Sequence, residues 1–149
     1  MAGKDKVERW ITVDIDDVGT VARDLSGDIV PGSMSGLGGK TFEEIEMTGI
    51  NEAHKNFLAG HWSHSFSCQF YLNDKATTGA YTVLKGIIGE VGTLNIEFGS
   101  GAAPTSNDPQ WDGEYLCVEA PIVLAGNKPV LAARFVPSGS TAPAWGTVA

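Results

Sequence analysis

Three histidines and a cysteine lie close together in the sequence, and these residue types bind metals and act as nucleophiles or bases. His54, His61 and His64 fall within eleven positions, and Cys68 follows four residues after the last of them. The segment around them alternates as a β-strand does, which puts His64 and Cys68 on one face and His61 on the other. Side chains four residues apart on a strand are too far separated to form a metal site or a nucleophile–base pair. The pattern therefore predicts core or surface residues and no metal centre.

The glycine-rich segment 31–40 invites comparison with a phosphate-binding loop, because it runs into Gly39-Lys40-Thr41. That motif requires a glycine five positions before Gly39, where this sequence has Met34. Three glutamates also follow within seven positions, where phosphate would lie. We therefore expect a flexible loop and no nucleotide site.

Carboxylates come in adjacent pairs, Asp16-Asp17 and Glu43-Glu44. Adjacent residues on a strand point to opposite faces, whereas glycosidase chemistry needs two carboxyl groups converging on one bond. The aspartates between positions 14 and 28 also lack the spacing of a calcium loop. The sequence predicts no cofactor and no enzymatic activity.

The net charge of −8 argues against binding to nucleic acid. The ten Lys and Arg residues are scattered, and phosphate neutralisation needs basic patches. The charge is explained equally well by solubility or by a surface that must not adhere to a polyanion. We find no apolar run of about 18 residues and no signal-peptide core, so we expect no membrane insertion and a protein made and kept in a cytoplasm. The two cysteines, Cys68 and Cys117, are expected to be free buried thiols.

The clearest structural pattern is the alternation in His61–Leu72, which predicts one long strand with an apolar face and a small polar face. A single α-helix is predicted over 80–88, with Thr77 or Thr78 as N-cap and Gly89 as its end. Both would belong to a mainly β domain, a β-sandwich or partly closed barrel with this one flanking helix, spanning residues 1–149. Segments 1–8 and 137–149 are expected to be flexible arms. Further strands are predicted at 10–15, 20–23, 41–48, 93–98, 114–120, 122–124 and 130–136. A helical turn is predicted at 25–30, and a connecting loop or short helical turn at 49–60.

The order of these elements, with short phrases such as Leu25-Ser26-Gly27-Asp28, Glu46-Met47-Thr48-Gly49 and Asp74-Lys75-Ala76-Thr77-Thr78-Gly79, resembles the major tail tube proteins of long-tailed bacteriophages with non-contractile tails. The resemblance covers roughly residues 10 to 147. It implies a subunit that assembles into stacked rings, six to a ring, whose inner strands form a continuous barrel through which DNA passes without specific binding. It also implies a virion location after assembly in the host cytoplasm, with tape measure, tail terminator and baseplate proteins as partners.

Within that resemblance, the strand glutamates and the small polar strand face are expected to line the lumen, although these positions could equally face ordinary solvent. The candidate lumen residues are Glu43, Glu44, Glu46, Ser63, Ser65, Ser67 and Gln69. Contacts between rings are expected from the loop 31–40, the segment 49–60 and both termini. The candidates in the two internal segments are Met34, Gly36, Leu37, Lys40, Asn51, His54 and Lys55.

Other functions remain open at this point. The same fold occurs in the tail terminator and in baseplate hub proteins. A monomeric β-barrel could instead bind a small ligand or carbohydrate on Trp111 or Trp145. An enzyme would require a distant carboxylate to converge with His54, His61 or Cys68.

Overall fold

Eight strands form one continuous sheet in the computed structural model, which describes residues 10–100 and 102–149. The path through this sheet runs β2, β1, β6, β7, β9, β5, with β10 beside β7 and β8 beside β9, and strands β3 and β4 form a separate two-stranded sheet. The strands are β1 (Trp10–Asp16), β2 (Ala22–Asp24), β3 (Thr41–Glu46), β4 (Phe57–Ser63), β5 (Phe66–Tyr71), β6 (Val91–Gly99), β7 (Pro109–Glu119), β8 (Ile122–Ala125), β9 (Lys128–Pro137) and β10 (Ala144–Thr147). The expected flexible arm 1–8 lies outside the described residues.

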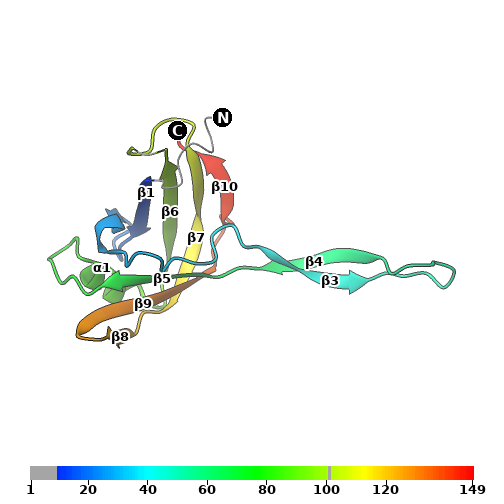
Figure 1. Ribbon diagram of the computed structural model, residues 1–149, viewed down its shortest axis with the longest axis horizontal. Helices are drawn as coiled ribbons and strands as arrows, with labels where there is room; N and C mark the ends of the chain where they lie inside the picture. Colours follow the sequence, from blue (N-terminus) through cyan, green and yellow to red (C-terminus); the bar gives the residue numbers. More distant parts are fainter. Residues whose placement is uncertain (1–9, 101) are drawn as a thin grey trace.

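The large sheet is strongly bent around the core. Figure 1 shows β1, β6 and β7 standing upright, with β5 and β9 running across their lower ends. Strand β7 joins the two halves, because it pairs with β6 along one edge and with β10 and then β9 along the other. A bulge between Cys117 and Glu119 interrupts the β7–β9 pairing, and bulges bend the strand that carries them. The end strands β2 and β5 are not paired with each other in the described structure. The predicted mainly β fold is therefore confirmed, with a sheet that does not close on itself.

The core fills the concave side of the bent sheet and is closed by the helix. It contains apolar side chains that alternate along the strands, including Val13, Phe66, Phe70, Ile96 and Phe135. Helix α1 (Ala80–Ile87) adds its predicted apolar stripe, Ala80, Val83, Leu84 and Ile87, all of which are buried. It is the only α-helix among the described residues, and no described helix is long and apolar enough to cross a membrane.

The start of α1 is held by a distant carboxylate and not by the predicted threonine cap. The N-cap position is Gly79, and the Ala80 amide donates to Asp28 Oδ2 at 3.1 Å. Asn73 Nδ2 donates to Asp28 Oδ1 at 3.0 Å. A carboxylate at a helix N-terminus satisfies a free amide and interacts favourably with the helix dipole. The 3₁₀ turn η2 (Ser26–Asp28), predicted as a helical turn, thus fixes where the helix begins.

The predicted single strand His61–Leu72 is wrong in its continuity but right in its alternation. The chain forms two strands, β4 and β5, separated by His64 and Ser65. The buried positions in this stretch still alternate, with His64, Phe66, Cys68 and Phe70 facing inward. The break occurs because the first half leaves the large sheet and pairs with β3 instead.

Strands β3 and β4 form a two-stranded hairpin, which we call the arm (residues 41–63). Figure 1 shows the arm projecting far from the body, on the side opposite α1 and β8. The predicted loop 49–60 is therefore too long, because Phe57–Gly60 already belong to β4. All six residues of β3 are exposed, which agrees with the prediction that a strand with glutamates on both faces could not lie in a dry core.

The C-terminal segment 137–149, expected to be a flexible arm, contains strand β10. This strand pairs with the first residues of β7, with Trp145 opposite Trp111. Their rings pack edge to face with centroids 5.1 Å apart, and Pro143 is fully buried. Aromatic packing thus anchors a segment whose composition resembles that of a flexible tail.

Candidate assembly interface

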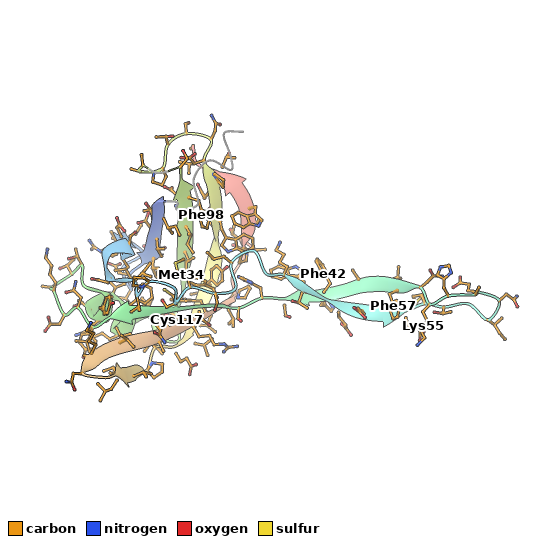
Figure 2. The ribbon with its side chains drawn as sticks, viewed as in Figure 1. Met34, Phe42, Lys55, Phe57, Phe98 and Cys117 are labelled. Carbon is orange, nitrogen blue, oxygen red and sulfur yellow. The ribbon has the colours of Figure 1, made fainter. Side chains whose placement is uncertain are left out.

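The arm carries exposed apolar side chains and no core of its own. Phe42 and Phe57 are about half exposed (50% and 51%), and Ile50 at the tip is fully exposed. Figure 2 places Phe42 near the root of the arm and Phe57 and Lys55 further out. An isolated two-stranded hairpin is at best marginally stable in water. Exposed apolar residues on such a hairpin therefore make it a candidate interaction surface.

The register of the arm gives its two faces different compositions. Phe42 lies opposite Trp62, and Glu46 lies opposite Phe57, so these side chains share one face with Glu44. On the other face Ile45 lies opposite Leu58. Glu43 lies beside them, and its side chain is close to Gly60. Each face is therefore a mixture of apolar side chains and carboxylates.

A buried polar chain holds the root of the arm. Trp111 Nε1 donates to Tyr115 Oη at 2.7 Å, and His64 Nε2 lies 2.7 Å from the same oxygen. The tryptophan can only donate, so the tyrosine oxygen accepts from it, whereas the direction of the bond between Tyr115 Oη and His64 Nε2 is set by the histidine tautomer. Nδ1 makes no hydrogen bond in the described structure. Burial lowers the pKa of His64 below 6.5, the charge of Lys40 acts in the same direction, and the Gly39 carbonyl opposes both.

The loop 31–40 packs along the outer edge of β5 and against the arm root. Ser35 exchanges two backbone hydrogen bonds with Ser67, at 2.9 and 3.0 Å. Gly36 has φ of +95° and lies against the Ser65 carbonyl, so a Cβ there would collide with backbone. Lys40 Nζ lies 4.6 Å from the ring centroid of Trp62. These contacts fix both chain segments that enter the arm.

The predicted lumen residues fall on two parts of the molecule. Ser67 and Gln69 lie on the outer face of β5 and are partly covered, while Ser63 and Ser65 are exposed at the arm root. The three glutamates lie on the arm itself, Glu43 on one face and Glu44 and Glu46 on the other.

The predicted inter-ring residues are likewise divided. Asn51, His54 and Lys55 are exposed at the arm tip, far from the body. Gly36 and Lys40 lie at the root. In contrast, Met34 and Leu37 are partly buried and pack against the core of their own chain.

The chemistry-bearing residues are dispersed by the fold. His54 and His61 lie on the arm, His64 lies at its root, and no group of three His, Cys, Asp or Glu residues in the described structure could hold a metal ion. Cys68 and Cys117 are free and buried, and burial raises the pKa of each thiol to about 11. Both thiols are therefore protonated at neutral pH.

The suggested stacking role of Trp111 is wrong, because its side chain is only 1% exposed. It belongs to the polar chain at the arm root. Trp145 is 56% exposed but packs on Phe98 and Trp111, so it is one wall of an aromatic cluster.

An acidic sheet face was missed by the sequence analysis. Asp14 on β1 lies directly opposite Asp24 on β2 and Asn95 on β6, and Asn95 lies opposite Asp112 on β7. The neighbours Val13 and Ile15 are buried, so this row faces away from the core. Burial, followed by the charges of Asp24 and Glu97, raises the pKa of Asp14. The signal was the alternation of Asp14 and Asp16 with apolar residues, but only the strand order shows which carboxylates become neighbours.

These features define the class of fold: an open, bent β-sheet closed by one helix and extended by a two-stranded arm. Solved structures that contain chains of this fold include two assemblies. One is the virion of a native gene transfer agent particle, with a TM-score of 0.63 and 13% identity over 90% of this chain and 95% of that chain. The other is the six-fold symmetrised baseplate of the anti-feeding prophage, with a TM-score of 0.61 and 15% identity over 93% of this chain and 95% of that one.

No protein-family model and no curated protein matches the sequence. At these identities the likeness establishes the fold alone. It supports the sequence-based resemblance to tail proteins at the level of architecture.

Proposed function

We propose that this chain is a structural protein of a phage-type tail, which assembles through its arm into rings that stack into a tube. The observation that carries this proposal is the arm, which is anchored at its root by the His64–Tyr115 hydrogen bond and carries exposed phenylalanines along its length. A ring subunit with such an arm can bury on a neighbour the apolar surface that its own body leaves exposed. The virion and baseplate neighbours support this role by their fold.

The two ends of the molecule are suited to a head-to-tail contact. Figure 1 shows the arm at one end and β8 at the other. Strand β8 pairs only with β9 among the described strands, and Ile122, Val123 and Leu124 on it are all exposed. An exposed apolar edge strand promotes association with another chain. A contact between two different ends of a subunit is heterologous, and it produces a closed ring when the rotation between neighbours adds up to a full turn. We propose a ring of six copies.

The lumen of the ring would be formed by the arm and the adjoining outer face of β5. This face offers Ser67 and Gln69, the arm root offers Ser63 and Ser65, and the arm adds Glu43, Glu44 and Glu46. Small polar and acidic side chains do not neutralise phosphate, so a duplex could pass in a hydrated state without being bound. The tube would belong to a virion tail, with tape measure, terminator and baseplate proteins as further partners.

The test is assembly by the purified full-length chain, followed by mass photometry and negative-stain electron microscopy. We expect rings or hollow tubes from the wild-type chain. A variant with Phe42→Ser and Phe57→Ser should remain a folded monomer of 15.7 kDa. Asp74→Ser, a change at an exposed loop position away from the arm, is the matched control and should assemble normally. Normal tubes from the double variant would contradict the role of the arm.

A second candidate, a tail-end or baseplate component, is favoured by the baseplate neighbour. Such a protein forms one ring and does not repeat along the tail. The same micrographs separate the two candidates, because a tube protein gives stacks of variable length and a tail-end component gives single rings.

A further inference from the structure

A cavity of about 160 Å³ opens on the body, between the β1–β2 turn, the end of α1 and the start of β6. Its apolar wall includes Ile15, Ile87, Leu94 and Phe135, all of which belong to the buried core. An engineered apolar cavity of ~150 Å³ is large enough to hold benzene. This cavity can therefore receive an apolar group of several carbon atoms.

The mouth of the cavity is both apolar and acidic. Val18 and Val91 at the mouth are 70% and 46% exposed. Asp16, Asp17 and Glu90 also line it, and no lining residue is basic. Asp17 is already paired with Arg23 at 2.9 Å, whereas Glu90 is exposed and has no ion-pair partner in the described structure.

A side chain that fits such a site combines an aliphatic stem with a positive charge at its end. Lysine meets both requirements, because its methylene groups pack on apolar surface while the ammonium group stays at the edge in contact with water or a carboxylate. Anchor residues of this kind, set in a pocket and surrounded by an apolar rim, contribute most of the binding energy of many interfaces.

The chain itself supplies such side chains in the segment that precedes β1. Residues 1–9 contain Lys4, Lys6 and Arg9, three of the ten basic residues of the whole protein. Nine extended residues span up to about 30 Å. We propose that the cavity receives Lys4 or Lys6 from the N-terminal segment of a second copy of this chain, an inference that rests on the proposed stacking of rings.

The geometry favours a second copy over the same chain. Trp10, the residue that follows the segment, pairs with Gly99. The cavity lies at the other end of β1, where Ile15 pairs with Leu94. The segment of the same chain would have to reverse direction and run back along the length of β1. A copy stacked end to end brings its own N-terminal segment to the cavity without that reversal.

The test is a charge exchange in the full-length chain. A cavity variant, Val18→Lys with Glu90→Lys, and an N-terminal variant, Lys4→Glu with Lys6→Glu, should each raise the protein concentration needed for tube formation by about ten-fold or more, because like charges would then meet at the interface. Single rings should still form. The chain that carries all four changes should recover most of the loss, and Asp74→Lys, outside the cavity, should behave as wild type.

The possible outcomes separate this inference from the proposed function. Wild-type tubes together with normal tubes from both variants, or no recovery in the combined chain, would overturn the inference and leave the proposed function intact. A wild-type chain that forms neither rings nor tubes would overturn both. If the N-terminal variant instead lowers the melting temperature of the monomer without changing stacking, the segment binds its own chain and the second copy is excluded.

Discussion

The body and the arm are built from the same kind of strand, yet they are stabilised in different ways. In the body, strands such as β5 carry alternate residues that are almost completely buried, and both edges of that strand are paired or covered. In the arm, all six β3 residues are exposed and the apolar side chains have little to pack against. The body thus has a core of its own, whereas the arm has exposed apolar side chains that we propose are covered by a neighbouring subunit. Alternation alone does not distinguish the two cases.

The largest expected difference is between two phenylalanines. Phe66 in β5 is fully buried and Phe42 in β3 is half exposed. Phe66→Ala should lower the free energy of unfolding by about 3–5 kcal/mol, because it removes buried apolar surface and leaves a cavity. Phe42→Ala should cost less than about 1 kcal/mol in the monomer. Denaturant unfolding at concentrations too low for assembly measures both, and equal losses would show that the arm belongs to the folding unit.

A smaller effect is expected where the two regions meet. Tyr115→Phe removes the oxygen shared by Trp111 and His64 and leaves both nitrogens unsatisfied in a buried site. Unsatisfied buried polar groups cost about 1–3 kcal/mol, so we expect a loss near the middle of that range. Tyr71→Phe, at a partly exposed position on β5, is the control and should change stability little. Equal losses of stability in the Tyr115→Phe and Tyr71→Phe variants would contradict the role of the polar chain as the anchor of the arm.

The pH dependence of stability should report on His64 at the arm root. Because burial lowers the pKa of His64 in the folded chain, the unfolded chain binds a proton more readily between that pKa and 6.5. The contribution of neutral His64 is complete above pH 6.5 and is lost as the pH falls towards the folded-state pKa. His64→Gln should flatten this part of the profile, measured by thermal unfolding between pH 5 and 7.5. Ser65→Ala, at the exposed neighbouring position, removes no titratable group and is the control.

The smallest effect concerns the acidic face of the body. The pKa of Asp14 is raised, so its ionised form is disfavoured in the folded chain, and the stability it provides is lost as the pH rises above its ordinary value of 3.8. Asp14→Asn should therefore stabilise the monomer at pH 7 by a few tenths of a kcal/mol, the size of one cross-strand like-charge contact. The gain should shrink in high salt. A loss of stability would show that this carboxylate makes a favourable contact.

Most of the fold was accessible from local patterns. Alternation predicted the buried set on β5, and the 3.6-residue spacing of Ala80, Val83, Leu84 and Ile87 predicted the helix and its buried stripe. These predictions succeeded because burial follows the periodicity of each element. The helix start was missed because its carboxylate, Asp28, lies 52 residues earlier in the chain.

The candidate site was harder to predict, because it depends on which strands pair. The sequence showed that β3 must be exposed, but it gave no reason for the chain to change sheets between Ser63 and Phe66. At that change His64 is hydrogen-bonded to Tyr115, 51 positions later, a contact that no local pattern reveals. The cavity is similarly assembled from residues on several elements, from Ile15 to Phe135.

The continuous chain from β4 into β5 has a mechanical consequence. A pull on the arm along its length enters the body through β5, whose six residues all pair with β9. Because the hydrogen bonds of an antiparallel pair lie perpendicular to the strands, a force along β5 loads the whole row in shear and does not open the bonds one at a time. A tube built from such subunits would transmit tension from one neighbour to the next through the β5–β9 pairing of each body.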